Sequence, residues 1–545
     1  MKNSSIQEEY DAIVVGSGCT GGTAAMVLAE QGLTVLVIEA GKNITPELAL
    51  SNPSSVTSHL KRLWRAFVSK SHNIQSNHPS FWKYDPDLFT NEKKNPYSYP
   101  ENKDFVWIRG RQLGGRSHTW GGVATRWSKH EFAIPERDGF GKWPLSHEEL
   151  VPYYERVEIA LRVRGTRYDL PHFSNPILEP GPNFTPAEEA FKELVNARWP
   201  NRHVVLSSGM HQEPVLGGGN PWPARSSLGT TLALALATGR VTVITDRAVR
   251  NVEFDVRTKK ATGISAVNCI TGDTEKYRSR SVVLCASAFE SVRILLNSAG
   301  SAHPDGPGNE SGLLGRCIMD HIAPHRHFSF PFTGTDASIV YPAGGPHSIW
   351  IPRWVNLETQ DCEFKGGIGI WGGIQRDFRP VNRTGYSAGM LQAICEMMPH
   401  PDNRIELDNG KVDAWGIPTL KITCELREND LRIQNRGSRI LDEILAATGS
   451  KIREVSFFNP VATAMAARAS KSSASPGYYI HEVGGARMGA SPQDSVVNSF
   501  CQVWGSQNLL VTDGACWPTI GWQSPTLTMM AISARACSHM AEKLK

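Results

Sequence analysis

Three glycines near the start of the chain have the spacing of a dinucleotide-binding turn. Gly16, Gly18 and Gly21 form a G-x-G-x-x-G motif that directly follows a short apolar, β-branched run. In such a motif the first glycine permits a tight turn, and the second lets the backbone approach a pyrophosphate. The third lets helix and strand pack closely. The motif predicts a dinucleotide site, without saying which dinucleotide binds there.

The residues around the motif predict the elements that would position it. Residues 12–15 are expected to form a buried strand, residues 23–31 a helix, and residues 33–39 a second strand. This is a βαβ unit whose helix N-terminus offers free N–H groups and a positive dipole end to phosphates. Glu39, which ends the second strand 18 residues after Gly21, is placed to accept a hydrogen bond from an adenosine ribose hydroxyl.

A second glycine-rich stretch spans residues 105–128. Two glycine pairs, Gly114-Gly115 and Gly121-Gly122, bracket a short polar segment that includes Ser117 and His118. Glycine at this density lets the backbone lie against a flat ligand. Three arginines in the stretch either serve phosphates or line the surface: Arg109, Arg111 and Arg116.

Composition limits the class of protein. The 545 residues are too many for one simple core, so at least two domains are expected. The net charge of +4 gives no reason to expect nucleic acid, and no apolar run is long enough to span a membrane. No signal peptide is visible at the N-terminus, and the ten scattered cysteines indicate reduced thiols. We therefore expect a cytoplasmic protein.

The remaining periodicities predict an α/β region followed by antiparallel strands. A strand and a helix near the C-terminus are expected to return to the first domain. Ser146 and Glu149 form a capping box that starts a helix. Further helices are expected at residues 225–236, 290–297, 428–447 and 526–544. Strands are expected at residues 241–245, 247–255, 261–268, 281–287, 327–332, 348–355, 404–407, 419–423 and 508–512.

Several strings together resemble the glucose–methanol–choline (GMC) family of FAD oxidoreductases. The resemblance rests on the opening glycine motif with Glu39, the GGRS loop at Gly114, WPLSHEEL from Trp143, LGR from Leu314, DH at Asp320, HEVGGARMG from His481, NLLVTDG from Asn508 and SPTLT from Ser524. These strings cover both ends of the chain and most landmarks between them. The DAWGIP string from Asp413 is most like the sugar-acting branch of the family.

The resemblance implies a fold and a division of the chain. We expect an α/β fold, α+β overall, with a Rossmann-like FAD-binding domain and a mainly antiparallel β-sheet substrate domain with helices. The FAD-binding domain is discontinuous and takes residues 1–45, 105–135, 200–320 and 475–545. Residues 46–104 are expected to form an insertion that covers the cofactor, and residues 136–199 and 321–474 the substrate domain.

The resemblance also implies a catalytic pair. Hydride passes from the substrate carbinol to flavin N5, and the histidine that takes the hydroxyl proton maps onto His481. Neutral imidazole is available as a base at physiological pH. The second polar position of the family, a histidine or asparagine, is Ser524 here. A serine hydroxyl reaches less far and cannot act as a base near neutral pH, so Gln523 or another side chain could supply that contact.

The cofactor contacts implied by the family follow from the same alignment of strings. They comprise Arg111, Gly114, Gly115, Ser117, His118, Ala248-Val249 near adenine, Asp513-Gly514 near the ribityl and pyrophosphate groups, and Pro525-Thr526 at the flavin pyrimidine edge. Some relatives tether FAD through a histidine in an S-x-H string, but Thr119 stands at that position here. We therefore expect non-covalent FAD, with a shifted link through His118 as the alternative.

These residues predict an FAD-dependent enzyme that oxidises a secondary alcohol of a sugar or glycoside to a ketone. The alternative within this class is oxidation of a non-sugar primary alcohol, of choline, aryl or aliphatic type, to an aldehyde. An NAD-dependent enzyme would leave the C-terminal strings unexplained, and a non-enzymatic flavoprotein would have no use for His481. No metal site is predicted. The electron acceptor, whether O2, a quinone or another redox partner, is not determined by the residues.

Overall fold

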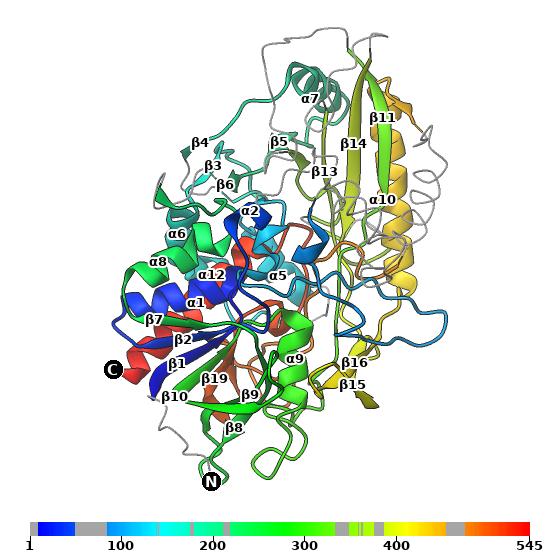
Figure 1. Ribbon diagram of the computed structural model, residues 1–545. Helices are drawn as coiled ribbons and strands as arrows, with labels where there is room; N and C mark the ends of the chain where they lie inside the picture. The colour runs from blue at the N-terminus through cyan, green and yellow to red at the C-terminus, as the bar shows by residue number, and fades with distance from the viewer. Residues whose placement is uncertain are drawn as a thin grey trace.

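The structure is a computed structural model that describes residues 9–49, 84–137, 139, 141–174, 179–210, 219–332, 348–357, 359–360, 363–374, 386–453 and 475–545. Two large sheets organise these residues: the first lies in the lower half of Figure 1, and the second in the upper right. The two sheets are joined by helices, loops and a separate hairpin.

The first sheet has a parallel centre in the order β19-β10-β1-β2-β7, with β18 antiparallel at the β19 edge. Its strands are β1 (Tyr10–Val15), β2 (Val35–Ile38), β7 (Val241–Ile244), β10 (Thr274–Leu284), β18 (Gln502–Val503) and β19 (Ser506–Val511). Val14 of β1 lies between Val37 of β2 and Val283 of β10, and all three are fully buried. Apolar strands buried on both faces are typical of a parallel sheet covered by helices.

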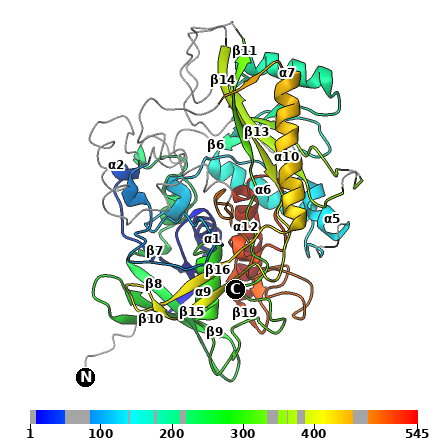
Figure 2. The ribbon, with the colours of Figure 1, turned by 90° about the vertical axis from the view of Figure 1, so that its right-hand side faces the viewer.

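Helices cover the first sheet and fix the position of its glycine turn. The helices near this sheet are α1 (Cys19–Glu30), α6 (His147–Leu161), α8 (Thr231–Ala237), α9 (Ala288–Leu296) and α12 (Thr526–Leu544). α1, α8 and α12 lie together on one side of the strands, and α9 lies on the other (Figures 1 and 2). The Ser533 hydroxyl of α12 donates to the Thr20 carbonyl of α1 at 3.2 Å, so the first and last helices are in direct contact.

Strand β10 belongs to two layers. Its second half pairs in parallel with β1, and its first half pairs antiparallel with β9 (Ala261–Asn268), which pairs in turn with β8 (Arg247–Phe254). The first half alternates between exposed and buried residues, whereas the second half is a continuous buried run. One strand therefore connects the parallel sheet to an antiparallel extension.

The second sheet is entirely antiparallel, in the order β17-β11-β14-β13-β12-β5. Its strands are β5 (Val205–Leu206), β11 (His325–Pro331), β12 (Ile349–Ile351), β13 (Ile368–Ile374), β14 (Tyr386–Cys395) and β17 (Lys451–Ile452). Helix α10 (Glu428–Ala447) packs on one face, where a Cβ on Gly437 would lie 2.8 Å from the Cys395 sulfur. On the opposite face the Trp522 ring occupies the space left by Gly369, where a Cβ would lie 1.9 Å from the ring. Each face of the second sheet therefore packs closely on another part of the chain.

A hairpin of β15 (Arg404–Val412) and β16 (Pro418–Thr423) reaches down from the second sheet to α9 (Figure 1). Asp413 in its turn forms a buried ion pair with Arg293 of α9, at 2.8 Å. The Arg293 guanidinium also donates to the carbonyls of Ile417 and Pro418. These bonds attach the hairpin to the helix that follows β10.

Smaller elements complete the described chain. They are α2 (Pro46–Ala49), α5 (Lys129–Arg137), α7 (Pro186–Arg198), a three-stranded sheet of β3 (Val163–Gly165), β4 (Glu179–Pro180) and β6 (Gly209–Met210), and 3-10 turns at Pro86–Leu88, Gly115–His118, Ser227–Gly229 and Gly514–Cys516. No helix among the described residues is long and apolar enough to cross a membrane. The nine cysteines that the structure describes are free thiols, and seven of them are buried.

The predicted fold class is confirmed, and the helices predicted at 428–447 and 526–544 have those bounds. The strand predicted at 281–287 instead runs from Thr274 to Leu284, because its first half alternates and so lacks the apolar run that marks the rest. The helix predicted at 225–236 begins only at Thr231, because the Ser226 side chain first caps a 3-10 turn. The domain boundaries stay a prediction, and residues 50–83 of the predicted cofactor-covering insertion lie outside the described residues.

Candidate active site

The glycine turn connects β1 to α1, and each motif glycine has a distinct environment. Gly16 has a φ of +100°, and a Cβ there would lie 2.3 Å from the Cys285 carbonyl oxygen at the end of β10. A Cβ on Gly21 would lie 2.0 Å from the Gly16 carbonyl oxygen. A Cβ on Gly18 would meet no atom within 4 Å. Gly16 and Gly21 are therefore required by packing, whereas Gly18 leaves open space at the helix N-terminus.

The Glu39 carboxylate lies against the same turn. Its Oε2 accepts hydrogen bonds from the Ser17 amide at 3.2 Å and the Ser17 hydroxyl at 2.5 Å, and its Oε1 accepts from the Gly41 amide at 2.8 Å. Burial raises the pKa of Glu39 despite these bonds. A carboxylate accepts about four hydrogen bonds, so one position remains for the ribose hydroxyl that the sequence predicts.

The second glycine-rich loop packs onto the first turn. The Gly114 amide donates to the Ser17 hydroxyl at 2.8 Å, and a Cβ on Gly115 would lie 3.6 Å from the Gly18 Cα. Ser227 connects the two loops, because its hydroxyl donates to the Ser17 carbonyl at 2.7 Å and its amide to the Ser117 hydroxyl at 2.9 Å. The fold thus brings Gly18, Gly114, Gly115 and Ser117 together.

His118 lies beneath this loop and is fully buried. Its Nε2 is 2.7 Å from the Leu113 carbonyl oxygen, which can only accept, so Nε2 holds the proton. Its Nδ1 has no hydrogen-bond partner within the described part of the chain. Burial lowers the pKa of His118 to about 4, so the ring is neutral near pH 7.

Arg111 lies at the predicted adenosine end. Its guanidinium is 3.8 Å from the centre of the Trp415 ring and 3.6 Å from the Cys269 sulfur, and its charge lowers the pKa of Glu39. Val249 lies in β8 and is buried in the main core. Trp415 also donates through its indole N–H to the Cys269 carbonyl, so this aromatic residue belongs to the Arg111 surroundings.

The C-terminal strings meet at the end of β19. Asp513 accepts from the Ala515 amide at 3.0 Å and from the Ser291 hydroxyl at 2.5 Å, and burial raises its pKa to about 6. The following turn pairs with the segment after His481: the amides of residues 484, 486 and 488 donate to the carbonyls of residues 514, 515 and 516 at 2.8–2.9 Å. Gly514 and His481 therefore belong to one hydrogen-bonded unit.

His481 has its backbone and its ring fixed by two neighbouring residues. Asp320 accepts from the His481 amide at 2.8 Å and from the Tyr479 amide at 3.1 Å. The Nδ1 of His481 is 2.9 Å from the Nδ1 of His321, whose Nε2 contacts the Gly521 carbonyl oxygen. His481 is only half-buried, whereas His321 is buried.

Charged groups surround this pair. Both oxygens of the buried Glu482 carboxylate accept from Arg116 at 2.9 Å, and Arg116 also donates to the Ser287 hydroxyl at 2.9 Å. Burial, the neighbouring His321 and the Arg116 charge lower the pKa of His481 well below its ordinary value. Burial and the Glu482 charge raise the pKa of Asp320 to about 7. The candidate base is therefore neutral near pH 7.

Ser524 is half-buried just before α12, and Pro525 and Thr526 begin that helix. No hydrogen bond joins Ser524 to His481 in this structure. Gln523 is fully buried beside Glu131, and burial raises the pKa of that glutamate although the Gln523 amide opposes the rise. Two other side chains contact the His481 ring: His321, through its Nδ1, and Tyr479, whose ring centre lies 4.8 Å from that of His481.

One row of side chains crosses the second sheet on the face opposite α10. The cross-strand pairs Trp350–Trp371, Trp371–Gln392 and Gln392–His325 place one residue from each of β12, β13, β14 and β11 side by side. Trp350 is fully buried beneath Trp522, with ring centres 5.1 Å apart. Trp371, Gln392 and His325 stay half-buried. This row offers an aromatic ring, an amide and an imidazole beside the segment that leads to Ser524.

Two helix N-termini fit an anionic dinucleotide such as FAD. Neither Gly18 before α1 nor Pro525 before α12 makes a side-chain capping bond, and neither first turn contains an acidic residue. Their first N–H groups have no acceptor within the helix, and these groups favour negative charge. Gly18, with open space at its Cα, permits close approach of a diphosphate. The residues present therefore fit the group that the sequence predicts.

The structure adds two residues to those that the sequence singled out for roles. His321 was part of a family string without a function, and Arg116 could not be distinguished from a surface arginine. A histidine next to an aspartate in an apolar segment was the available signal for His321. Nothing in the sequence around Arg116 shows that it meets Glu482, because 366 residues separate them.

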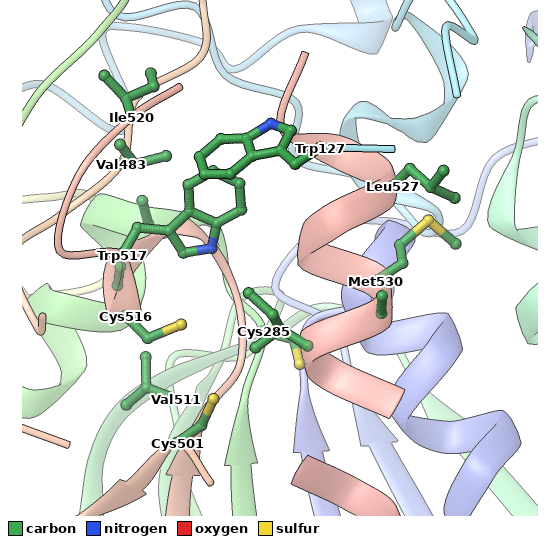
Figure 3. Packing of buried hydrophobic residues seen from close by; sticks show 14 of the residues in the cluster. Trp127, Cys285, Val483, Cys501, Val511, Cys516, Trp517, Ile520, Leu527 and Met530 are labelled. Carbon is green, nitrogen blue, oxygen red and sulfur yellow. The ribbon is translucent and has the colours of Figure 1, made fainter. Parts of the chain in front are cut away.

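Figure 3 shows the packing behind the C-terminal part of this site. Cys516 and Trp517 follow the Gly514 turn, and Trp517 lies against Trp127, with ring centres 4.6 Å apart. Leu527 and Met530 project from α12 on the side away from the two tryptophans in this view. All five side chains are buried. Buried apolar side chains therefore pack against both the turn and the first turns of the helix.

Comparison with known proteins identifies a family pattern along most of the chain. Residues 10–323 and residues 399–533 match two family models that are both described as GMC oxidoreductase. The chain is 26% identical to 2-methyl-1,2-propanediol dehydrogenase of Mycolicibacterium austroafricanum, with 98% of this chain and 96% of that protein covered. It is 24% identical to the fructose dehydrogenase large subunit of Gluconobacter japonicus, with 98% of each covered.

A solved structure has the same fold. The crystal structure of pyridoxine 4-oxidase from Mesorbium loti superimposes with a TM-score of 0.62, covers 98% of each chain and is 19% identical.

The motif glycines give a matched pair of tests. Gly21→Ala places a Cβ against the Gly16 carbonyl, so we expect a lower midpoint of urea unfolding in the protein without cofactor. Gly18→Ala meets open space, so we expect an unchanged midpoint and at least a tenfold weaker affinity for the dinucleotide, measured by fluorescence titration. Equal midpoints for both variants would contradict the packing role of Gly21, and wild-type affinity in Gly18→Ala would contradict the diphosphate site.

Proposed function

Because the chain belongs to the GMC oxidoreductase family, we propose that it oxidises a secondary hydroxyl of a sugar or glycoside to a ketone, with His481 as the proton acceptor. The family consists of FAD-dependent enzymes that act on alcohol groups, so the chain is an FAD-dependent oxidoreductase. The substrate, the carbon that is oxidised and the role of each residue belong to the proposal.

The observation on which the proposal depends is the neutral, half-buried His481 beside the C-terminal turn. FAD, when bound, supplies the acceptor for the hydride of the carbinol carbon. Asp320 holds the His481 backbone, and His321 contacts its Nδ1, so Nε2 is the ring atom left to receive the hydroxyl proton. Burial keeps this base unprotonated near neutral pH, which general-base catalysis requires.

The sugar specificity is supported by the second sheet and by one relative. The half-buried row of Trp371, Gln392 and His325 offers an apolar ring and hydrogen-bonding groups. The ring suits the apolar face of a sugar, and the polar groups suit its hydroxyls. The fructose dehydrogenase large subunit is similar over nearly the whole chain. The DAWGIP string itself lies at the predicted adenosine end, where the Arg111 guanidinium lies over the Trp415 ring, so its support for a sugar substrate is indirect.

A second candidate function is oxidation of a primary alcohol to an aldehyde. It is favoured by the similarity to 2-methyl-1,2-propanediol dehydrogenase, because the diol in that name has one primary and one tertiary hydroxyl, and only the primary one can form a carbonyl. The same His481 would serve either reaction. The two candidates differ in which small-molecule substrates reduce the flavin, and the electron acceptor is O2, a quinone or another redox partner in both.

We expect FAD to be bound without a covalent link. Thr119 stands where a tethering histidine would be expected, and the Nε2 of His118 is engaged by the Leu113 carbonyl. Acid precipitation of the purified yellow protein should therefore release all flavin absorbance into the supernatant. Colour retained in the pellet would contradict this, and its loss in His118→Ala would then place the link at His118.

An anaerobic screen tests the proposed function. Sugars, glycosides and simple primary alcohols are mixed with the FAD-loaded protein, and bleaching of the oxidised flavin band is followed. We expect bleaching by at least one sugar or glycoside and a ketone product. Bleaching by primary alcohols alone would select the second candidate, and no bleaching by either class would contradict both. Admitting air afterwards shows whether O2 serves as the acceptor.

The assigned roles of His481 and Ser524 predict unequal losses. His481→Ala should slow flavin reduction by about 10²–10⁴-fold, the usual contribution of a general base, while FAD stays bound. Ser524→Ala should cost about tenfold at most, because one neutral hydrogen bond contributes about 1 kcal/mol. Stopped-flow absorbance gives both rates, with His400→Ala, at a half-buried histidine outside the candidate site, as a control. Rapid bleaching in His481→Ala would remove the base assignment.

A further inference from the structure

We propose that His321 sets the tautomer of His481, so that His481 always presents an unprotonated Nε2 to the substrate hydroxyl. This inference rests on the proposed function, because it takes His481 to be the base. It makes His321 a positioning residue, which acts on the reaction through its neighbour. The role is independent of which alcohol is oxidised.

The direction of the hydrogen bonds follows from a backbone carbonyl. The Gly521 oxygen can only accept, so the contacting Nε2 of His321 must hold a proton. A neutral imidazole has one N–H, so the Nδ1 of His321 is then an acceptor. The Nδ1 of His481 lies 2.9 Å from it and must donate. The proton of neutral His481 is therefore on Nδ1, and Nε2 has a free lone pair.

This assignment requires His321 to be neutral, and its surroundings agree. His321 is buried, and no carboxylate within the described chain accepts from its ring. The nearby Asp320 oxygens accept backbone amides instead, and the Tyr479 ring lies edge-on at 5.4 Å. Burial lowers the pKa of His321 to about 4. A cationic His321 would donate from both nitrogens and would force the opposite tautomer on His481.

The same short string also fixes where the lone pair points. Asp320 accepts from the amide of His481, and His321 contacts its ring. Two adjacent residues therefore fix both the backbone and the ring of that histidine. The rings of the two histidines meet nearly perpendicularly, at 77°, with centres 5.1 Å apart. A hydrogen bond from a third group to a catalytic imidazole is a general way to fix its tautomer and orientation.

The proton balance of the reaction is consistent with this arrangement. The substrate hydroxyl gives its proton to Nε2 of His481 as the carbonyl forms, and the carbinol hydride leaves with its electron pair to FAD. His481 then holds protons on both nitrogens, and its Nδ1–H stays bonded to His321. The Gly521 carbonyl cannot take a proton, so His321 donates no proton onward through that bond. The base regains its lone pair when Nε2 gives its proton to water.

Two variants of nearly equal size separate positioning from packing. In His321→Asn the amide oxygen replaces Nδ1 as an acceptor, so we expect flavin reduction within about tenfold of the wild-type rate. In His321→Leu no acceptor remains and His481 can move its proton to Nε2, so we expect a loss of about 10²–10⁴-fold with FAD affinity retained. Equal losses in the two variants would show that His321 only fills space, and a wild-type rate in His321→Leu would overturn the proposal.

The pH profile gives a second readout that packing would not change. In the wild type, reduction should fall on the acid side only below pH 6.5, because burial, His321 and Arg116 lower the pKa of His481. The other ionisable groups near the pair are Asp320, Tyr479 and Glu482. His321→Asn should keep the acid limb, whereas His321→Leu should have a flat, low profile because neutral His481 then holds its proton on Nε2 and can accept another only at Nδ1, not from the substrate hydroxyl. An acid limb of wild-type amplitude in His321→Leu would contradict the proposal.

A measurement without turnover separates this inference from the proposed function. In holoenzyme labelled with ¹⁵N in its histidine rings, long-range ¹⁵N–¹H correlations show which nitrogen is protonated, and His481→Ala and His321→Asn assign the two residues. We expect Nδ1–H for His481 and Nε2–H for His321. Nε2–H on His481 would overturn the inference even if the enzyme oxidises sugars. The expected pattern in a protein that no alcohol reduces would leave the tautomer established and the function rejected.

Discussion

The candidate active site depends on one set of backbone hydrogen bonds, between the segment that follows His481 and the turn that follows β19. These bonds place residues 484–488 along residues 514–516, and so fix the candidate base against the edge of the first sheet. The Asp320 carboxylate holds the other side of the same segment. Three stretches far apart in the chain must therefore fold together before His481 has a defined position. Gly484, with a φ of +90° and no room for a Cβ beside the Cys317 carbonyl, lets the segment make both sets of contacts.

Burial determines the chemistry available at this junction. Removing an imidazole from water disfavours its charged form, so His481 and His321 are both neutral under ordinary conditions. The same effect raises the pKa of Asp320 and of Asp513. The fixed charges nearby, Arg116 and Glu482, form a pair with each other and add little net charge. The result is a site in which an unprotonated base persists without a carboxylate bound to its ring.

The separate hairpin between β14 and α10 packs on the elements of the first sheet. The hairpin of β15 and β16 is attached to α9 by the Asp413–Arg293 ion pair, and it brings Trp415 to Arg111 at the predicted adenosine end. A string that resembles a sugar-acting branch therefore contacts Arg293 and Arg111 and is not part of the row of Trp371, Gln392 and His325. Similarity in a short string and proximity to the substrate are separate properties. Only the strand register shows which residues share the polar face of the second sheet.

Local sequence patterns were enough to predict those helices and strands whose characteristic residues all lie within one segment of the chain. The βαβ unit with its three glycines, the α10 and α12 helices and the fold class followed from periodicity, capping and glycine spacing. The family strings located His481 and Ser524 but gave no reason to pair either with His321. The double role of β10, the contact of Arg116 with Glu482 and the His321–His481 bond were decided only by tertiary structure. The last two contacts join residues 366 and 160 positions apart, and their distance and direction depend on how sheets and loops pack rather than on local residue types.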